Sequence, residues 1–187
     1  MSGIAKRVVF GYSDSNILEF PVEISWDLGW DRDSKLECIE RVKRKVYEQY
    51  GVEDALDVTT ANSSFENGKL LSPHILRYPG MNMDIVSTMR NGQKHLPSDD
   101  VSVITYVYCY MYAICHNEDA FNVFKQYEYF FDVFWKPEDG WNTQARLCVM
   151  LKIIIHNKLH YKFFKNDDAE SIIAFRDWFN KNKMSYI

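Results

Sequence analysis

The chain has 187 residues and a formal net charge of −4, with 47% hydrophobic and 16% aromatic residues. This composition excludes a disordered chain and is sufficient for one globular domain, residues 1–187, with a packed core. The acidic balance also excludes an overall basic surface, so any contact with DNA or RNA has to be made by a local site.

The sequence predicts a soluble, cytoplasmic protein that does not span a membrane. Its N-terminus lacks the apolar segment of a signal peptide, and its longest apolar runs are interrupted by Glu118, Lys152 and His156. None of the four cysteines belongs to a C-x-x-C pair, so free thiols are a better interpretation than a disulfide framework.

The first fifty residues predict a β-hairpin followed by a helix. Arg7–Tyr12 and Ile17–Trp26 are rich in β-branched and aromatic residues, and the second run alternates apolar with polar positions. A helix is expected over Lys35–Tyr50, with Ser34 as its N-cap and Glu37 at the spacing of a capping box. We interpret the basic residues of this helix as a solvated face rather than a nucleic-acid patch.

The rest of the chain predicts mostly helix. Val101–His116 is apolar on nearly all sides and is expected to be a central buried helix, although its β-branched start leaves a strand as the alternative. Other helices are expected over Met83–Gly92, from Asn117 to about Phe131, over Thr143–His156 and from Asp167 onwards. The predicted architecture is a single α+β domain, mainly helical, with a small N-terminal β-sheet.

The stretch Leu56–Tyr78 is a candidate binding loop. A short β-like run, Leu56–Thr60, leads into residues rich in Asn, Ser and Gly and then into an apolar segment. Hydroxyl and amide side chains held between two apolar anchors can hydrogen-bond an oxygen-rich ligand. The same residue types are common in loops without a function, so composition leaves both interpretations open.

A second stretch, Trp141–Arg146, opens the helix that is predicted to end at His156. A helix N-terminus favours anions such as a phosphate, and Arg146 adds a guanidinium that can bind a phosphate through two hydrogen bonds. A functional interpretation requires that this stretch and Leu56–Tyr78 meet in the folded protein.

Metal and nucleophile patterns are weak. His156 and His160 have an i, i+4 spacing on one helix face that can hold a metal, but no Glu lies between them, and histidines near a helix end are also favoured by the helix dipole. Cys115 and His116 are neighbours on a helix and point about 100° apart, so they cannot act as a catalytic pair by themselves. We expect no metal and no cofactor.

Taken together, these segments resemble the NADAR-type antitoxins that are encoded beside DarT-type DNA ADP-ribosyltransferase toxins. Short matches carry the resemblance, and they extend over most of the chain. They are Arg7–Phe10, the strand that ends near Trp26, the helix that begins near Ser34, Leu56–Thr60, Gly68–Ser72 and Trp141–Arg146. The last of these matches is the most specific.

The resemblance implies an α+β fold that binds ADP-ribose. It also implies an N-glycosidase that removes ADP-ribose from guanine bases in DNA and so protects the cell from the toxin. ADP-ribose or ADP-ribosylated nucleic acid would be the ligand, and the toxin is a candidate partner. Position by position, the implied ligand contacts are Thr59, Thr60, Lys69, Ser72, Asn142, Gln144 and Arg146.

The chain departs from the family at the catalytic carboxylate. Cleavage of a glycosidic bond through an oxocarbenium-like state needs a carboxylate near the anomeric carbon. The family carries a Glu between the Leu-Ser stretch and the central helix, whereas Asn82–Leu96 contains Asp84 as its only acidic residue. Asp84 is therefore the candidate catalytic carboxylate. Two alternatives stay open: a module that binds ADP-ribose or a related nucleotide without cleaving it, and a protein-interaction domain without a small-molecule site.

Overall fold

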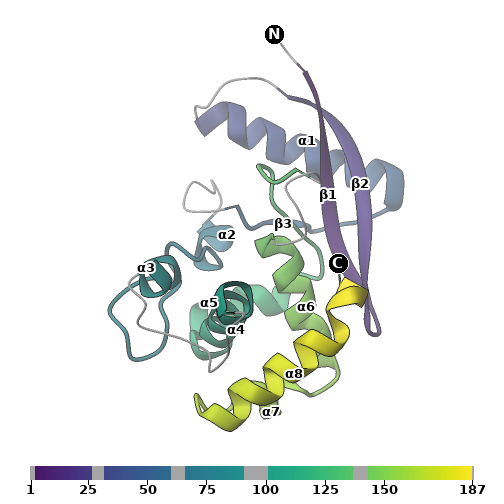
Figure 1. Cartoon of the computed structure of the whole chain (residues 1–187). Coiled ribbons are helices and arrows are strands. Elements are labelled where there is room, and N and C mark those ends of the chain that lie inside the picture. The colour runs from purple at the N-terminus through teal and green to yellow at the C-terminus, as the bar shows by residue number, and fades with distance from the viewer. Residues whose placement is uncertain (1–2, 27–31, 60–65, 91–100, 137–142, 187) are drawn as a thin grey trace.

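The computed structural model describes residues 3–26, 32–59, 66–90, 101–136 and 143–186. In these ranges, an N-terminal hairpin forms part of a four-stranded mixed sheet, and eight helices make up most of the remaining structure (Figure 1). The predicted α+β, mainly helical fold class is confirmed. In chain order the elements are β1 (Gly3–Ser13), β2 (Asn16–Trp26), α1 (Arg32–Tyr50), β3 (Leu56–Asp57), α2 (Glu66–Leu70), α3 (Ile85–Arg90), α4 (Val101–His116), α5 (Glu118–Gln126), β4 (Phe130–Phe131), α6 (Gln144–His156), α7 (His160–Phe163) and α8 (Ala169–Tyr186).

The sheet has the strand order β2-β1-β4-β3. β1 and β2 form a long antiparallel hairpin in which Gly3 lies opposite Trp26 and Ser13 lies opposite Asn16, which confirms the predicted hairpin. β4 pairs antiparallel with β1, and β3 pairs parallel with β4. Because β3 and β4 are parallel, their carboxyl ends lie side by side, and so do the residues that follow them.

The two faces of the sheet are covered by different helices. In β1, Val9 belongs to a core cluster with Ile39 and Val42 of α1, whereas Val8 and Phe10 belong to a larger cluster with α4, α5, α6 and α8. Successive residues of a strand point to opposite faces, which explains this division. Figure 1 shows α1 beside the upper part of the hairpin, with the other helices grouped below it.

α4 runs through the larger core cluster, and its tyrosines form two stacked pairs on different faces of the helix. Tyr106 and Tyr110 stack with ring centroids 6.1 Å apart, and Tyr108 and Tyr112 stack at 5.7 Å. The ring of Tyr108 also lies 5.5 Å from that of Phe175 in α8. An i, i+4 spacing produces both pairs on separate faces. The predicted central helix is confirmed with its bounds, and the alternative of a strand is wrong.

Two predictions of helix bounds are wrong. α1 begins at Arg32, so Ser34 lies inside the helix rather than at its N-cap. The helix after Asn117 ends at Gln126, because the expected last turn, Phe130–Phe131, forms β4 instead. This short strand lies between β1 and β3, so pairing with distant residues overrides the local helix preference.

His156 and His160 do not share a helix face. α6 ends at His156 and α7 begins at His160, and between them Lys158 adopts a φ of 58°. The left-handed backbone at Lys158 breaks the helix, so the predicted i, i+4 arrangement of the two histidines is wrong.

Among the helices of the described ranges, none is long and apolar enough to cross a membrane. The four cysteines are free thiols, and Cys38, Cys109 and Cys148 are buried. Their burial among apolar side chains is typical of cysteine as a small hydrophobic residue.

Gly11 in β1 leaves no room for a side chain. A Cβ at this position would lie 2.7 Å from two ring carbons of Tyr129 and 3.3 Å from the ring of Phe20. We expect Gly11→Ala to lower the free energy of unfolding by about 1–3 kcal/mol, because the packed rings would have to move. Urea denaturation followed by tryptophan fluorescence measures the effect. Gly3→Ala, whose Cβ meets nothing within 4 Å, is the control, and equal effects of the two changes would contradict this packing.

Candidate functional site

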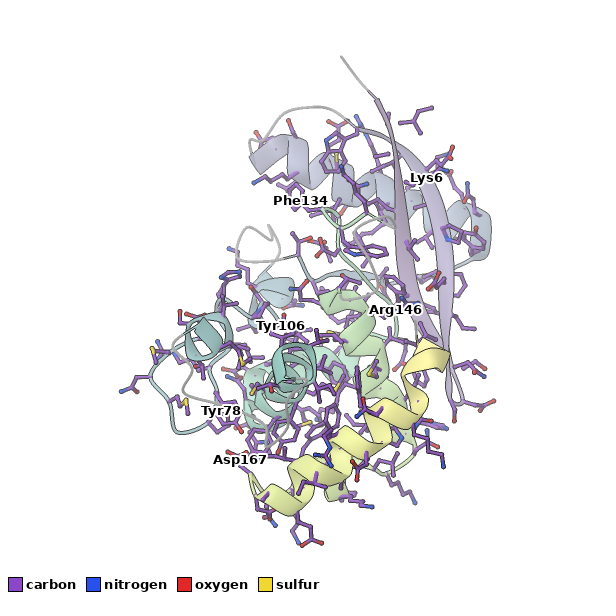
Figure 2. The ribbon with its side chains drawn as sticks, in the orientation of Figure 1. Lys6, Tyr78, Tyr106, Phe134, Arg146 and Asp167 are labelled. Carbon is purple, nitrogen blue, oxygen red and sulfur yellow. The ribbon has the colours of Figure 1, made fainter. Side chains whose placement is uncertain are left out.

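The two stretches singled out in the sequence meet the same helix. In the first, the carbonyl of Leu71 accepts a hydrogen bond of 2.7 Å from Tyr110 Oη of α4. In the second, Gln144 Nε2 donates to Tyr106 Oη at 3.3 Å, one turn earlier on α4. Figure 2 shows Tyr106 within the helical body and Arg146 nearer the hairpin. Burial raises the pKa of Tyr106 to about 12, so its hydroxyl stays neutral at physiological pH.

The N-terminus of α6 holds a buried hydroxyl without a partner. Thr143 is the N-cap residue, with an extended backbone at a φ of −115°, but its side chain makes no capping hydrogen bond. The residue is only 1% exposed, and its Oγ1 has no hydrogen-bond partner. Such a hydroxyl is unfavourable, and the amides of the first helical turn beside it also lack intrahelical acceptors. This end of α6 therefore has donors to offer to an anion.

Arg146, in the first turn of α6, is a buried cation paired with Glu19 of β2. Its Nη2 donates to Glu19 Oε1, and its guanidinium carbon lies 5.3 Å from the centre of the Phe10 ring. Its Nε is buried and has no hydrogen-bond partner. Burial lowers the pKa of Arg146, and the carboxylate of Glu19 opposes this shift, so the guanidinium remains charged.

Two buried carboxyl groups meet at the ends of β3 and β4. The hydroxyl of Thr59 lies 2.5 Å from Asp57 Oδ1 and 3.1 Å from Asp132 Oδ1. The amide of Val133 donates to Asp57 Oδ1 and to Thr59 Oγ1, each at 3.1 Å. Asp132 Oδ1 also accepts a hydrogen bond of 3.1 Å from the amide of Trp135. The parallel pairing of β3 and β4 brings these side chains together.

A protonated carboxyl group fits this network. The Thr59 hydroxyl carries one proton and faces both carboxyl groups, so a proton held by one of the carboxyl groups would serve the contact that the hydroxyl does not. Burial raises the pKa of Asp57 to about 7, against hydrogen bonds from Thr59 and Val133 that lower it. Burial also raises the pKa of Asp132. A carboxyl group that keeps its proton near neutral pH can act as a general acid.

Trp135 connects these carboxyl groups with the start of α6. Its amide donates to Asp132, its ring lies 5.6 Å from the ring of Phe10, and Phe10 in turn contacts the guanidinium of Arg146. The Nε1 of Trp135 is buried and has no hydrogen-bond partner. Together with Thr143 Oγ1 and Arg146 Nε, it is the third buried polar atom without a partner in these two neighbouring segments.

The candidate catalytic carboxylate, Asp84, lies immediately before α3. Its Oδ1 accepts from the amide of Ser87 at 2.9 Å, and its Oδ2 accepts from Ser87 Oγ at 2.7 Å. Burial acts to raise the pKa of Asp84, but the hydrogen bonds from Ser87 and the nearby His74 hold it below its usual range. Asp84 is therefore ionised at neutral pH and has no proton to donate.

Ser72 and Lys69 shape the turn that precedes α3. Ser72 Oγ accepts from the amide of His74 at 3.3 Å, and the Ser72 carbonyl accepts from the amide of Leu76 at 2.8 Å. The carbonyl of Lys69, in α2, accepts from the amide of Ser72 at 3.0 Å. Ser72 is fully buried, so its hydroxyl belongs to the turn rather than to an open surface.

The predicted site residues thus fall into three separate groups. They are Gln144 and Arg146 at the start of α6, Thr59 between the buried carboxyl groups, and Lys69, Ser72 and Asp84 around α2 and α3. Thr60 and Asn142 lie outside the described residues.

Asp57, Asp132 and Glu19 were not identified from the sequence as site residues. Asp57 and Asp132 each interrupt an apolar run, Leu-Asp-Val and Phe-Phe-Asp-Val-Phe, and an acidic residue within such a run is a signal of a buried carboxyl group. Glu19 gives no such signal, because it occupies a polar position of an alternating strand. Its partner Arg146 is 127 positions away in the sequence.

A surface hollow of about 930 Å³ lies away from these groups, between α7 and α8. Lys162, Lys165, Asp168 and Asp177 line it around Trp178, so its charges are mixed. None of the described residues that were predicted for the site lines this hollow. Within the described ranges, no group of three or more His, Cys, Asp or Glu side chains is arranged to hold a metal ion.

The raised pKa of Asp57 makes the stability of the protein depend on pH. Between about pH 4 and pH 7 the folded protein holds a proton that the unfolded chain, with an ordinary carboxyl pKa of 3.8, has lost. The contribution of Asp57 to the free energy of unfolding therefore falls as the pH rises through this window, by at most roughly 4 kcal/mol. Asp57→Asn removes the titration and keeps an acceptor for Val133 and Thr59. The free energy of unfolding of this variant minus that of the wild type should therefore be larger at pH 8 than at pH 5.

Urea denaturation at intervals between pH 5 and pH 8 measures this difference. Glu53→Gln, which removes the charge of an exposed carboxylate, is the control and should show no comparable trend. A difference between Asp57→Asn and the wild type that does not change with pH would mean that Asp57 is already ionised in the folded protein.

Comparison with known proteins assigns no family to the chain. No model of a known protein family matches it, and no curated protein matches it significantly. The function therefore has to be inferred from the chemistry of the α6 N-terminus and of the buried carboxyl groups.

Proposed function

We propose that this protein binds ADP-ribose at the N-terminus of α6. We propose further that it hydrolyses the N-glycosidic bond between ADP-ribose and guanine in DNA, as a cytoplasmic antitoxin to a DNA ADP-ribosyltransferase. The observation that carries the proposal is a pair of buried groups without partners at this end of the helix, Thr143 Oγ1 and Arg146 Nε. They support an anionic, oxygen-rich ligand. The resemblance to the NADAR-type antitoxins supplies the identity of that ligand.

The guanidinium of Arg146 suits a diphosphate. Nε and Nη2 lie on one edge of the planar group and can donate together to two oxygens. The burial of Arg146 limits the access of water to this edge, which strengthens its interaction with an anion. Thr143 adds a hydroxyl and Gln144 adds an amide next to it, and both can bind the oxygens of a ribose or a phosphate.

Hydrolysis of the glycosidic bond requires both an ionised carboxylate and a proton donor. The bond between the anomeric carbon and the guanine nitrogen breaks, and the nitrogen keeps the electron pair and takes a proton. A water oxygen bonds to the carbon and loses a proton. Asp84, held ionised by Ser87, can stabilise the cationic transition state or accept the proton from water. Asp57 and Asp132, whose pKa values are raised, can hold a proton for the departing base.

Thr143→Val should change stability and binding in opposite directions. The valine removes a buried hydroxyl without a partner, so the free energy of unfolding should rise by about 1 kcal/mol. Binding of ADP-ribose should weaken roughly tenfold, because the ligand loses a hydrogen bond. Thermal denaturation and isothermal titration calorimetry measure the two effects.

Thr105→Val is the matched control for this change. Thr105 also has a buried Oγ1 without a partner, but it lies one turn before Tyr108, on the side of α4 that packs against α8. The control should change the stability little, because a helical threonine hydroxyl can turn to a carbonyl of the preceding turn, and it should leave the affinity for ADP-ribose unchanged. Arg146→Lys, which keeps the charge but loses the two-donor edge, should weaken binding by about tenfold or more. Absence of binding by the wild type at millimolar ADP-ribose would overturn the proposal.

The roles of the carboxyl groups can be separated by turnover of ADP-ribosylated guanine in DNA. We expect Asp84→Asn to slow turnover by at least about 100-fold while ADP-ribose still binds. Asp57→Asn should lower the rate and remove the decline in rate above about pH 7, because it removes the carboxyl group that titrates there. Wild-type turnover and an unchanged pH profile in both variants would contradict these assignments.

A binding module without activity is the second candidate function. Both carboxylate oxygens of Asp84 already accept hydrogen bonds from Ser87, which favours a role of Asp84 in capping α3. In that case the same α6 site would hold ADP-ribose without cleavage. Saturable binding together with no release of ADP-ribose from modified DNA over several hours would favour this function.

A further inference from the structure

The ion pair between Arg146 and Glu19 lies at the proposed binding site. We infer that the carboxylate of Glu19 occupies the position of a ligand phosphate on Arg146 and is displaced when a diphosphate binds. This inference rests on the proposed function, since it concerns the same N-terminus of α6. It specifies the anionic group that the ligand places on the guanidinium, and it identifies β2 as the element whose side chain gives way.

The two members of the ion pair differ greatly in burial. The side chain of Arg146 is 8% exposed, whereas that of Glu19 is 49% exposed. A buried guanidinium that loses its anion is strongly unfavourable, but a half-exposed carboxylate can return to water at little cost. Arg146 therefore always requires an anion, while Glu19 can be replaced by another one.

The ion pair also leaves part of the guanidinium unused. Glu19 Oε1 contacts Nη2, and Nε on the same edge is buried without a partner. A phosphate can accept hydrogen bonds from both atoms at once. Thr143 Oγ1, which is also buried without a partner, gives the ligand a donor that Glu19 does not use. A diphosphate therefore satisfies polar atoms that the ion pair leaves unsatisfied, and this difference favours the exchange.

β2 supplies a matched pair of carboxylates for a test. Glu19 lies opposite Phe10, next to Arg146, while Glu23 lies opposite Lys6, four residues further along the same face of the strand. Both are exposed, and the ion pair with Arg146 belongs to Glu19. Glu19→Gln and Glu23→Gln thus remove the same charge from the same strand, and only the first removes the competitor.

Binding of ADP-ribose and of inorganic pyrophosphate should be measured by calorimetry for the wild type and both variants. We expect Glu19→Gln to bind both ligands roughly fivefold to tenfold more tightly, since its neutral amide competes weakly for Arg146. Glu23→Gln should bind both with the affinity of the wild type. The thermal stability of Glu19→Gln without ligand should fall clearly, because the buried guanidinium of Arg146 loses its anion. Tighter binding together with lower stability distinguishes displacement from a purely structural role of Glu19.

The possible failures can be told apart. ADP-ribose binding that is equal in the wild type and Glu19→Gln, or weaker in the variant, would overturn the exchange and leave the proposed function standing. Tighter pyrophosphate binding by Glu19→Gln without any ADP-ribose binding would support the exchange and overturn the proposed function. If neither ligand binds to any of the three proteins, the exchange and the proposed function are both overturned. If Glu23→Gln gains as much affinity as Glu19→Gln, the gain comes from the lower negative charge of β2 and not from the displacement of Glu19, and the exchange is overturned.

Discussion

The candidate site depends on the burial of one positive charge. α6 packs against β1 and β2 and carries Arg146 into a position where its guanidinium lies over Phe10 and away from water. A cation buried in this way must have an anion beside it. In the folded chain that anion is Glu19, which ties the hairpin to the first turn of α6. The hairpin therefore contributes directly to the site.

The surroundings of Asp57, Asp84 and Asp132 shift the pKa values of these carboxyl groups in opposite directions. Asp84 accepts hydrogen bonds on both oxygens from Ser87 and stays ionised. Asp57 is enclosed at the end of β3 with Asp132 nearby, and both of these pKa values are raised. Groups whose pKa values are pushed apart can serve as base and acid at one pH. Thr59, predicted as a ligand contact, links the two raised carboxyl groups and so helps to determine which of them holds the proton.

Most of the fold could be predicted from the sequence because its main elements have local causes. The alternation of apolar residues in Ile17–Trp26 and the continuous apolar surface of Val101–His116 determine their own structures. Phe130–Phe131 could not be assigned in this way, since they become a strand only between β1 and β3. The same limit applies to the site. Arg146 was found from its place in a helix start, whereas its partner Glu19 is defined only by the packing of α6 on the hairpin.

Buried polar atoms without partners do not all carry the same weight. Thr88 and Thr105 also have such hydroxyls, but both lie inside helices, where a small rotation can bring a threonine hydroxyl to a carbonyl of the preceding turn. The Nε of Arg146 has no such local acceptor, because the guanidinium is a rigid plane already oriented by Glu19 and Phe10. The hydroxyls of Thr88 and Thr105 therefore cost little free energy and are compatible with a structural role. An unsatisfied donor on a buried cation costs more, so the Nε of Arg146, one turn after Thr143 at the N-terminus of α6, is the atom of this set that would gain most from an added acceptor.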